Sequence, residues 1–312
     1  MNPGFQSWQE HYQPLIDSGT IRPGNEPRIM LQEGETTVEN AVILIHGLSD
    51  SPYFMTAIGN KFYELGFNVL MPLMPGHSIN SVDEAEKKME SLDVKEWQDE
   101  VAFAVACARE LGQKVSIGGL SNGGLLGTYH TIMAPQDITG ALFLFSAALD
   151  LGDIIENVVR VDSPVVSFLL GVGEKFQENK KGELVNDNNP YRYAWIPKNG
   201  VIQLSNCIKQ IDDYYDRQGK PKYSDITQPV FAAHSEADAA ARISEIELLV
   251  RNHPQSETKT EFFRMKKKFN VDHAGVVLAE NVYSPTGEPQ EGKNIFFDDM
   301  MAAMEGFIKK YL

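Results

Sequence analysis

Short apolar segments alternate with segments of helical periodicity along most of the chain, and this alternation constrains the fold more than any other feature of the sequence. Residues 41–45 are all apolar, which is typical of a strand that is buried on both faces. Strands of this kind occur in parallel sheets with helices on either side. The sequence therefore predicts an α/β fold in which a mostly parallel sheet is flanked by helices.

The alternation runs in two blocks that are separated by residues 150–226. The first block predicts strands at residues 41–45, 67–73, 114–120 and 138–149, and helices at 52–65, 94–111 and 122–133. The second block predicts a strand that ends near residue 234, a strand at 258–265, and helices at 240–250 and 298–312. We therefore expect one α/β core formed by residues 1–150 and 226–312, with a mainly helical cap inserted at residues 151–225.

Length, composition and charge limit the classes of protein to consider. The chain has 312 residues, of which 42% are hydrophobic, and this favours one large domain with an insertion over two independent domains. The formal net charge is -15, from 43 acidic and 28 basic residues, so the average surface repels phosphate backbones and anionic lipids. A nucleic-acid partner is therefore not expected, and the basic run at residues 266–268 is interpreted as a solvated strand end.

Nothing in the sequence resembles a leader, a membrane span or a disulfide framework. The first residues lack the basic and apolar regions of a signal peptide, and no apolar run approaches the roughly 18 residues that cross a bilayer. Two cysteines occur, Cys107 and Cys207, and both are interpreted as ordinary core residues. We therefore expect a soluble, cytoplasmic protein without stable membrane insertion.

A G-x-S-x-G pentapeptide occupies residues 119–123, between a predicted strand and a predicted helix. A serine at such a turn has a strained backbone, and glycine on both sides gives room where chain segments crowd together. The turn would raise the hydroxyl of Ser121 above the sheet and direct the first helix amides, notably that of Asn122, toward one point. A glycine-rich connection with an incidental serine is the alternative. A phosphate-binding loop is disfavoured, because neither of its glycine spacings is present.

With these features the chain resembles the α/β-hydrolases from about residue 41 to the C-terminus. The motifs that carry the resemblance stand at predicted strand ends and are His46-Gly47, Ser121, Asp238 and His273. The segment HGLSDSPYFM at residues 46–55 and the Pro-Gly-His turn at 75–77 are similar to bacterial carboxylesterases and monoacylglycerol-lipase-like enzymes. In that family the residue after His-Gly donates an oxyanion-hole amide, which the resemblance assigns to Leu48.

The order of catalytic residues in this family, nucleophile then acid then base, selects the base. His273 is the expected base because it lies beyond the last predicted strand. His253 also follows the acid candidates, but it lies in a predicted connector between a helix and a strand. His46 lies far ahead of the acid candidates, so a structural role is expected for it.

The same order selects the acid from the residues that follow the strand ending near residue 234. Asp238 takes the family position, and Glu236 and Asp150 remain alternatives. Asp272 is too close in sequence to the base. The chain departs from the family at Asn122, where an apolar residue, His or Gln is more usual.

We therefore expect a serine hydrolase that cleaves a small carboxylic ester through an acyl-enzyme, with Ser121, Asp238 and His273 as the triad. The amides of Leu48 and Asn122 would stabilise the oxyanion. The expected substrates carry short to medium acyl chains or resemble monoacylglycerol. No metal or cofactor is expected, because no cluster of His, Cys and Asp has ligand spacing and H-E-x-x-H is absent.

The apolar segment at residues 158–176 is too rich in aliphatic residues for an exposed helix, so it either packs on the core or lines an acyl pocket. Phe168, Leu169 and Tyr193 are the candidate pocket residues. The fold also hosts acyltransferases, peptidases, carbon–carbon bond hydrolases and non-catalytic ligand-binding proteins, and these functions remain alternatives.

Overall fold

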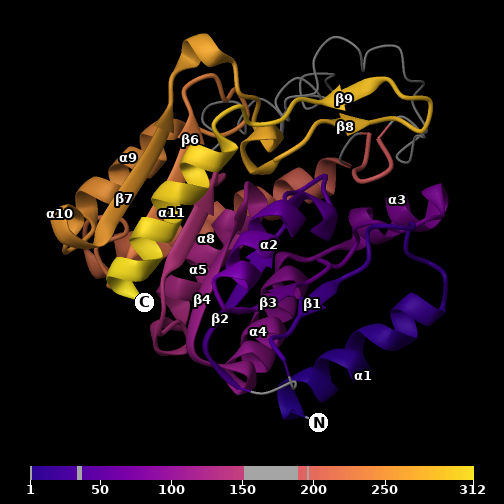
Figure 1. Cartoon of the computed structure of the whole chain (residues 1–312), viewed down its shortest axis with the longest axis horizontal. Helices are drawn as coiled ribbons and strands as arrows, with labels where there is room; N and C mark the ends of the chain where they lie inside the picture. The colour runs from indigo at the N-terminus through magenta and orange to yellow at the C-terminus, as the bar shows by residue number, and fades with distance from the viewer. Residues whose placement is uncertain (1, 34–36, 151–188, 195–196) are drawn as a thin grey trace.

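A seven-stranded sheet forms the centre of the computed structural model, which describes residues 2–33, 37–150, 189–194 and 197–312 (Figure 1). The strand order is β1-β3-β2-β4-β5-β6-β7, and all neighbours are parallel except β1 and β3. The strands are β1 (Arg28–Met30), β2 (Val38–Ile45), β3 (Asn68–Met71), β4 (Gly112–Leu120), β5 (Leu142–Phe145), β6 (Val230–Ser235) and β7 (Thr260–Met265). The predicted α/β fold with a mostly parallel sheet is confirmed.

Helices cover both faces of the sheet (Figure 1). One face packs against α2 (Thr56–Glu64) and α11 (Phe297–Tyr311). The opposite face packs against α4 (Val94–Leu111), α5 (Asn122–Met133), α8 (Lys198–Gln218) and α9 (Ile243–Asn252). The other helical segments are α1 (Pro3–Asp17), α3 (Val82–Ser91), α10 (Ser256–Lys259) and the 3-10 turns Pro52–Met55, Pro135–Asp137, Lys267–Phe269 and Ala274–Val277.

The central strand β2 explains why the sheet needs helices on both faces. Ala41, Ile43 and Ile45 belong to one hydrophobic core, and Val42 and Leu44 belong to the other. All five side chains are fully buried. Because successive strand residues point to opposite faces, an uninterrupted apolar run requires a cover on each side.

Several predicted elements agree with the structure and others differ in length. The predicted helix at residues 94–111 is α4, which begins at a capping box formed by Asp93 and Glu96. The predicted strand at 138–149 is shorter, because only Leu142–Phe145 pairs with β4 and β6. Cys107 and Cys207 are free and buried, as predicted.

Two elements near the N-terminus were not predicted. The helix α1 packs along α4 and buries the rings of Trp8 and Tyr12. Next along the chain, β1 adds an antiparallel edge strand to β3. With three residues, β1 is too short for an alternating pattern to stand out in the sequence.

Most of the predicted cap, residues 151–188 together with 195–196, lies outside the described residues. The helix α8 falls within the predicted insertion, and it packs against α3, α4 and α5. A two-stranded hairpin of β8 (Val282–Tyr283) and β9 (Pro289–Glu291) lies near the 189–194 segment, which it contacts through Glu291. The limits of the cap therefore remain a prediction.

Candidate active site

Ser121 occupies the turn between β4 and α5 in a backbone conformation that non-glycine residues rarely adopt. Its φ is 54° and its ψ is -116°. The backbone is held by neighbouring segments, since its N–H donates to the carbonyl of Phe145 at 3.1 Å and its carbonyl accepts from Ala148 at 3.1 Å. A strained residue persists only where its surroundings over-determine it, and such residues cluster at functional sites.

The two glycines that flank Ser121 are required by close backbone contacts. A Cβ at Gly123 would stand 2.0 Å from the carbonyl oxygen of Ile45, and a Cβ at Gly119 would stand 2.2 Å from the same oxygen. Real Cβ atoms do not approach so closely. The steric need for glycine at both positions of the pentapeptide is therefore confirmed.

Asp238 follows β6, and its side chain is fully buried. Its Oδ1 accepts hydrogen bonds from the N–H groups of Ala240 and Ala241 at 2.8 and 3.0 Å, and its Oδ2 lies 2.7 Å from Nδ1 of His273. Burial alone would raise the pKa of Asp238, but the charge and hydrogen bond of His273, together with His234 and the amide of Ala241, lower it to about 2. The carboxylate is thus ionised and accepts a hydrogen bond from the Nδ1–H group of His273.

His273 is buried immediately before the 3-10 turn Ala274–Val277. Burial opposes its charge, yet the carboxylates of Asp238 and Asp50 raise its pKa above the ordinary value. Its Nε2 has no hydrogen-bond partner, so no hydrogen bond to Ser121 is formed in this structure. In free hydrolases this contact is commonly long and tightens when substrate binds.

A second imidazole, from His234, also reaches the carboxylate of Asp238, and sequence reasoning did not single it out. Its Nε2 lies 3.3 Å from Oδ2 of Asp238 and 3.2 Å from the carbonyl oxygen of Ala241. Burial lowers the pKa of His234, so the ring is neutral and donates from Nε2. His234 therefore helps to fix the acid in place.

The alternative acids have other partners. Glu236 pairs with Lys266 and with Arg264, each at 3.0 Å. Asp150 lies 3.6 Å from the guanidinium of Arg242. Among these three carboxylates, Asp238 is the one that contacts His273 within the described residues.

The second candidate base, His253, lies in the connector that follows α9, as its sequence position suggested, and its ring is hydrogen-bonded there. Its Nε2 donates to the carbonyl of Gln228 at 2.9 Å, and its Nδ1 accepts from the N–H of Gln255 at 3.0 Å. Both ring nitrogens are therefore occupied by backbone groups. The ring joins the end of α9 to the start of β6.

The loop at residues 47–50, which follows β2, runs beside Ser121. A Cβ placed on Gly47 would stand 3.5 Å from the Cβ of Ser121, so the two backbones are neighbours. No described residue accepts a hydrogen bond from the N–H of Leu48. The N–H of Asn122 belongs to the first turn of α5, where amides lack an intrahelical acceptor.

Two buried histidines brace the start of this loop. Nε2 of His46 accepts from the N–H of Met74 at 3.1 Å, so its Nδ1 carries the proton and donates to the carbonyl of Gly47 at 2.8 Å. His77 donates from Nε2 to the carbonyl of Leu48 at 2.7 Å. Burial lowers the pKa of both rings. Both rings are structural groups in their contacts, as expected for His46.

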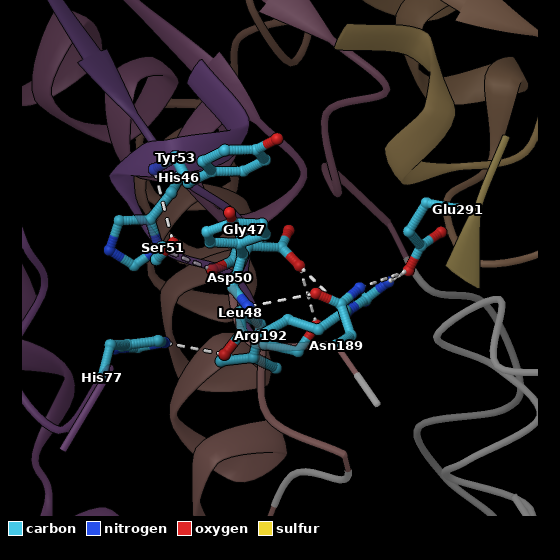
Figure 2. A network of polar contacts seen from close by, with 12 residues as sticks. His46, Gly47, Leu48, Asp50, Ser51, Tyr53, His77, Asn189, Arg192 and Glu291 are labelled. Carbon is cyan, nitrogen blue, oxygen red and sulfur yellow. Dashed lines mark hydrogen bonds and ion pairs between the residues drawn. The ribbon is translucent and has the colours of Figure 1, made fainter. Parts of the chain in front are cut away.

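A buried ionic network adjoins the loop, and sequence reasoning missed it (Figure 2). It consists of Arg192, Asp50 and Glu291, which come from three distant parts of the chain. Nε of Arg192 lies 3.3 Å from Oδ1 of Asp50, and its Nη1 pairs with Oε1 of Glu291. The sequence marks Asp50 as a charge within the loop, but nothing in it indicates the partners.

The candidate pocket residues divide between described and undescribed parts of the chain. Phe168 and Leu169 lie outside the described residues. Tyr193 is buried, and its hydroxyl donates to the carbonyl of Gly76 at 3.0 Å and accepts from the N–H of Ile79 at 2.9 Å. The ring therefore joins the 189–194 segment to the loop after β3, and its role in a pocket remains a prediction.

Within the described residues, no group of three or more His, Cys, Asp or Glu side chains is arranged to hold a metal ion. Of the helices described there, none is long and apolar enough to cross a bilayer.

The parallel sheet, its crossover helices and the strained serine after β4 define the α/β-hydrolase class. A family model described as serine aminopeptidase, S33, matches residues 36–265, and the chain belongs to this family. It is a serine hydrolase of the lipase and esterase type.

Named relatives agree with this class. The thermostable monoacylglycerol lipase of Bacillus sp. (strain H-257) is 23% identical over 74% of this chain and 82% of the relative. The structure from work on LipS and LipT, two metagenome-derived lipolytic enzymes, covers 93% of this chain and 100% of its own at a TM-score of 0.65 and 18% identity. A soluble variant of the monoglyceride lipase of Saccharomyces cerevisiae covers 94% and 97% at a TM-score of 0.63 and 12% identity.

Proposed function

We propose that the protein hydrolyses small carboxylic esters, with short to medium acyl chains or a monoacylglycerol-like structure, through a triad of Ser121, His273 and Asp238. The observation that carries the proposal is the 2.7 Å contact between Nδ1 of His273 and the ionised Asp238, while Nε2 of His273 has no partner among the described residues. An imidazole held in this way is oriented to take a proton from a hydroxyl. The name of the Bacillus relative supports an ester of glycerol as substrate.

In the first half of the reaction, Nε2 of His273 takes the proton of the Ser121 hydroxyl as its oxygen attacks the ester carbonyl carbon. The carbonyl electron pair moves to oxygen and forms a tetrahedral oxyanion. The imidazolium then gives its proton to the leaving alcohol as the carbon–oxygen bond breaks. Asp238 stabilises the imidazolium and keeps its proton on Nδ1.

In the second half, a water molecule attacks the acyl-enzyme while His273 takes one of its protons. Collapse of the second tetrahedral intermediate releases the carboxylic acid and returns the proton to Ser121. The same groups thus act twice, and no other reactant is needed.

The N–H groups of Leu48 and Asn122 are the proposed oxyanion donors. Their support is the proximity of Gly47 to Ser121 and the position of Asn122 in the first turn of α5. Amides that already point at the developing charge need no reorganisation during the reaction, and loss of one such donor typically costs about 100-fold or more in rate.

The test compares the wild-type protein with Ser121→Ala. We expect the wild type to react with a fluorophosphonate probe at Ser121 and to hydrolyse p-nitrophenyl esters and monoacylglycerols, and we expect the variant to do neither. An acyl-length series then defines the substrate, and aminoacyl p-nitroanilides test the peptidase activity that the family description names. Turnover of anilides but not of esters would overturn the proposal, as would an unlabelled wild type.

A further inference from the structure

Arg192 contacts the 47–50 loop through two nitrogens of its guanidinium group, and the third nitrogen pairs with the β8–β9 hairpin (Figure 2). Its Nη2 donates to Oγ of Ser49 at 2.5 Å, its Nε lies 3.3 Å from Oδ1 of Asp50, and its Nη1 pairs with Glu291 of β9. The hydroxyl of Ser49 in turn donates to Oδ1 of Asp50 at 3.0 Å. The guanidinium therefore links the hydroxyl of Ser49 and the carboxylate of Asp50 to Glu291 of the β8–β9 hairpin.

The backbone next to Arg192 reaches the same loop. The N–H of Tyr193 donates to the carbonyl of Ser49 at 2.8 Å. The carbonyl of Arg192 is itself held by Arg22 at 3.0 Å. The backbone of the 189–194 segment is thus bonded both to the loop and to Arg22, and the side chain of Arg192 extends from this segment to the loop.

These contacts fix the peptide groups on either side of Leu48. The carbonyl of Gly47 accepts from His46, the carbonyl of Leu48 accepts from His77, and the carbonyl of Ser49 accepts from Tyr193. The N–H of Leu48 has no acceptor among the described residues, so it is free to donate to a substrate atom. The His46 and His77 bonds hold the first part of the loop. The 189–194 segment adds contacts to Ser49 and Asp50 in the second part, where the N–H of Asp50 also donates to the carbonyl of Gly47 at 3.2 Å.

The network is strongly shielded from solvent. The side chains of Arg192 and Asp50 are 6% and 3% exposed, and that of Glu291 is 14% exposed. Burial opposes the charge on Arg192, but the carboxylates of Glu291 and Asp50 raise its pKa above the ordinary value, so it stays charged. In such surroundings a fork of fixed N–H donors defines a geometry that a flexible ammonium group does not.

We propose that Arg192 is a positioning residue, which holds Ser49 and Asp50 so that the N–H of Leu48 points at the ester oxyanion. This inference rests on the proposed function, because it assigns a purpose to the Leu48 amide. Arg192 acts through the loop and does not touch the substrate. Through Arg192, the 189–194 segment sets the position of the Leu48 amide, which stabilises the tetrahedral oxyanion as it forms.

The main experiment is Arg192→Met, assayed with p-nitrophenyl butyrate. Each preparation is first titrated with a fluorophosphonate, so that rates are expressed per reactive Ser121. A displaced oxyanion donor acts in the transition state, so we expect kcat per titrated site to fall about 10- to 100-fold while KM changes less than about threefold. Arg192→Lys keeps the positive charge but loses the planar set of N–H donors. Its kcat per titrated site is expected to lie between those of wild type and Arg192→Met.

A second readout separates positioning from general damage to the fold. An alkyl trifluoromethyl ketone forms a hemiketal with the serine and presents an oxyanion to the same amides. Its inhibition constant is expected to rise in proportion to the fall in kcat/KM across wild type, Arg192→Lys and Arg192→Met. A purely structural role would lower the titrated fraction and the melting temperature, but it would leave kcat per site and the inhibition constant unchanged, and that result would overturn the inference.

Arg192→Met leaves two buried carboxylates unpaired and can fail to fold for that reason. The triple variant Arg192→Met/Asp50→Asn/Glu291→Gln removes all three charges together and serves in its place, with the same expected fall in kcat per site. Arg109→Met is the control, because Arg109 of α4 pairs with Asp137 of the 3-10 turn Pro135–Asp137 and not with Ser49 or Asp50. We expect wild-type kcat in this control.

The outcomes also distinguish this inference from the proposed function. If wild type hydrolyses esters, Ser121→Ala does not, and the charge-free triple variant keeps wild-type kcat per site, the proposed function stands and the role of Arg192 fails. If the wild type itself neither reacts with the probe nor hydrolyses esters, the proposed function fails first.

Discussion

Nδ1 of His273 lies 2.7 Å from Oδ2 of Asp238, although 34 residues separate the two in the chain. The carboxylate is held on its other oxygen by the amides of Ala240 and Ala241, and His234 approaches it from β6. The acid is therefore fixed from three sides before substrate binds. The hydrogen bond to Asp238 fixes the orientation of the His273 ring and keeps its proton on Nδ1.

The first prediction concerns the choice of acid. Asp238→Asn should lower kcat for ester hydrolysis by about 10⁴-fold, because an amide in place of the carboxylate favours the wrong tautomer of His273. Glu236→Gln is the matched control, since Glu236 pairs with Lys266 and Arg264 instead. It should change kcat by less than about threefold. Steady-state kinetics on both variants checks the assignment, and a larger loss in the Glu236 variant would move the acid to that residue.

The second prediction concerns pH. His273 must be neutral to act as a base, and its pKa in the folded protein is raised above the ordinary value of 6.5 by Asp238 and Asp50, whereas Arg192 lowers it. The acid limb of the kcat/KM profile should therefore lie above pH 6.5, with activity lost as the pH falls through it.

Two charge variants give this limb opposite shifts. Asp50→Asn should move it to lower pH and Arg192→Met to higher pH, because one variant removes a negative and the other a positive charge near His273. The measurement is kcat/KM from pH 5 to 9 at constant ionic strength. Shifts of the same sign in both variants would contradict the electrostatic assignment.

The third prediction concerns the glycine turn at Ser121. Gly123→Ala should destabilise the protein by about 3 kcal/mol, because the new methyl group meets the backbone carbonyl of Ile45. Gly306→Ala is the control, since nothing lies within 4 Å of a Cβ at that position in α11, and it should stabilise the fold by about 0.5–1 kcal/mol. Urea denaturation followed by circular dichroism measures both, and equal stability of the two variants would refute the steric argument.

The fourth prediction concerns the packing of α1. The hydroxyl of Tyr12 donates to the buried carboxylate of Glu100 on α4, which also lies 3.1 Å from Nε2 of His11. Tyr12→Phe should cost about 1–3 kcal/mol of unfolding free energy, because Glu100 loses a donor in a buried site. The exposed residue Gln13 offers the control Gln13→Ala, which should stay within about 0.5 kcal/mol of wild type.

Thermal and urea denaturation decide this prediction, together with ester kinetics. The kcat of Tyr12→Phe should equal that of wild type, because the hydroxyl of Tyr12 bonds to Glu100 of α4 and not to a proposed catalytic residue. A loss of kcat without a loss of stability would show that α1 affects the active site.

The sequence alone predicted the sheet and the local shape of the serine turn. Residues 41–45 are apolar at every position, and burial on both faces follows from that pattern wherever the strand pairs. The glycines at 119 and 123 likewise report a local need, since crowding at a strand-to-helix turn excludes a Cβ. The order of Ser121, Asp238 and His273 came from a family resemblance, and the contact between the last two is what the structure adds.

Only the tertiary structure decided which charges meet. Asp50, Arg192 and Glu291 come from a loop, an irregular segment and a hairpin, and none of these has a periodicity that would predict their contact. The second imidazole on Asp238 and the docking of α1 on α4 are of the same kind. Hydrophobic periodicity depends on residues that are close in sequence, so it can be recognised from the sequence alone. A buried ion pair depends on how the rest of the fold packs distant segments against each other, and the sequence does not reveal that packing.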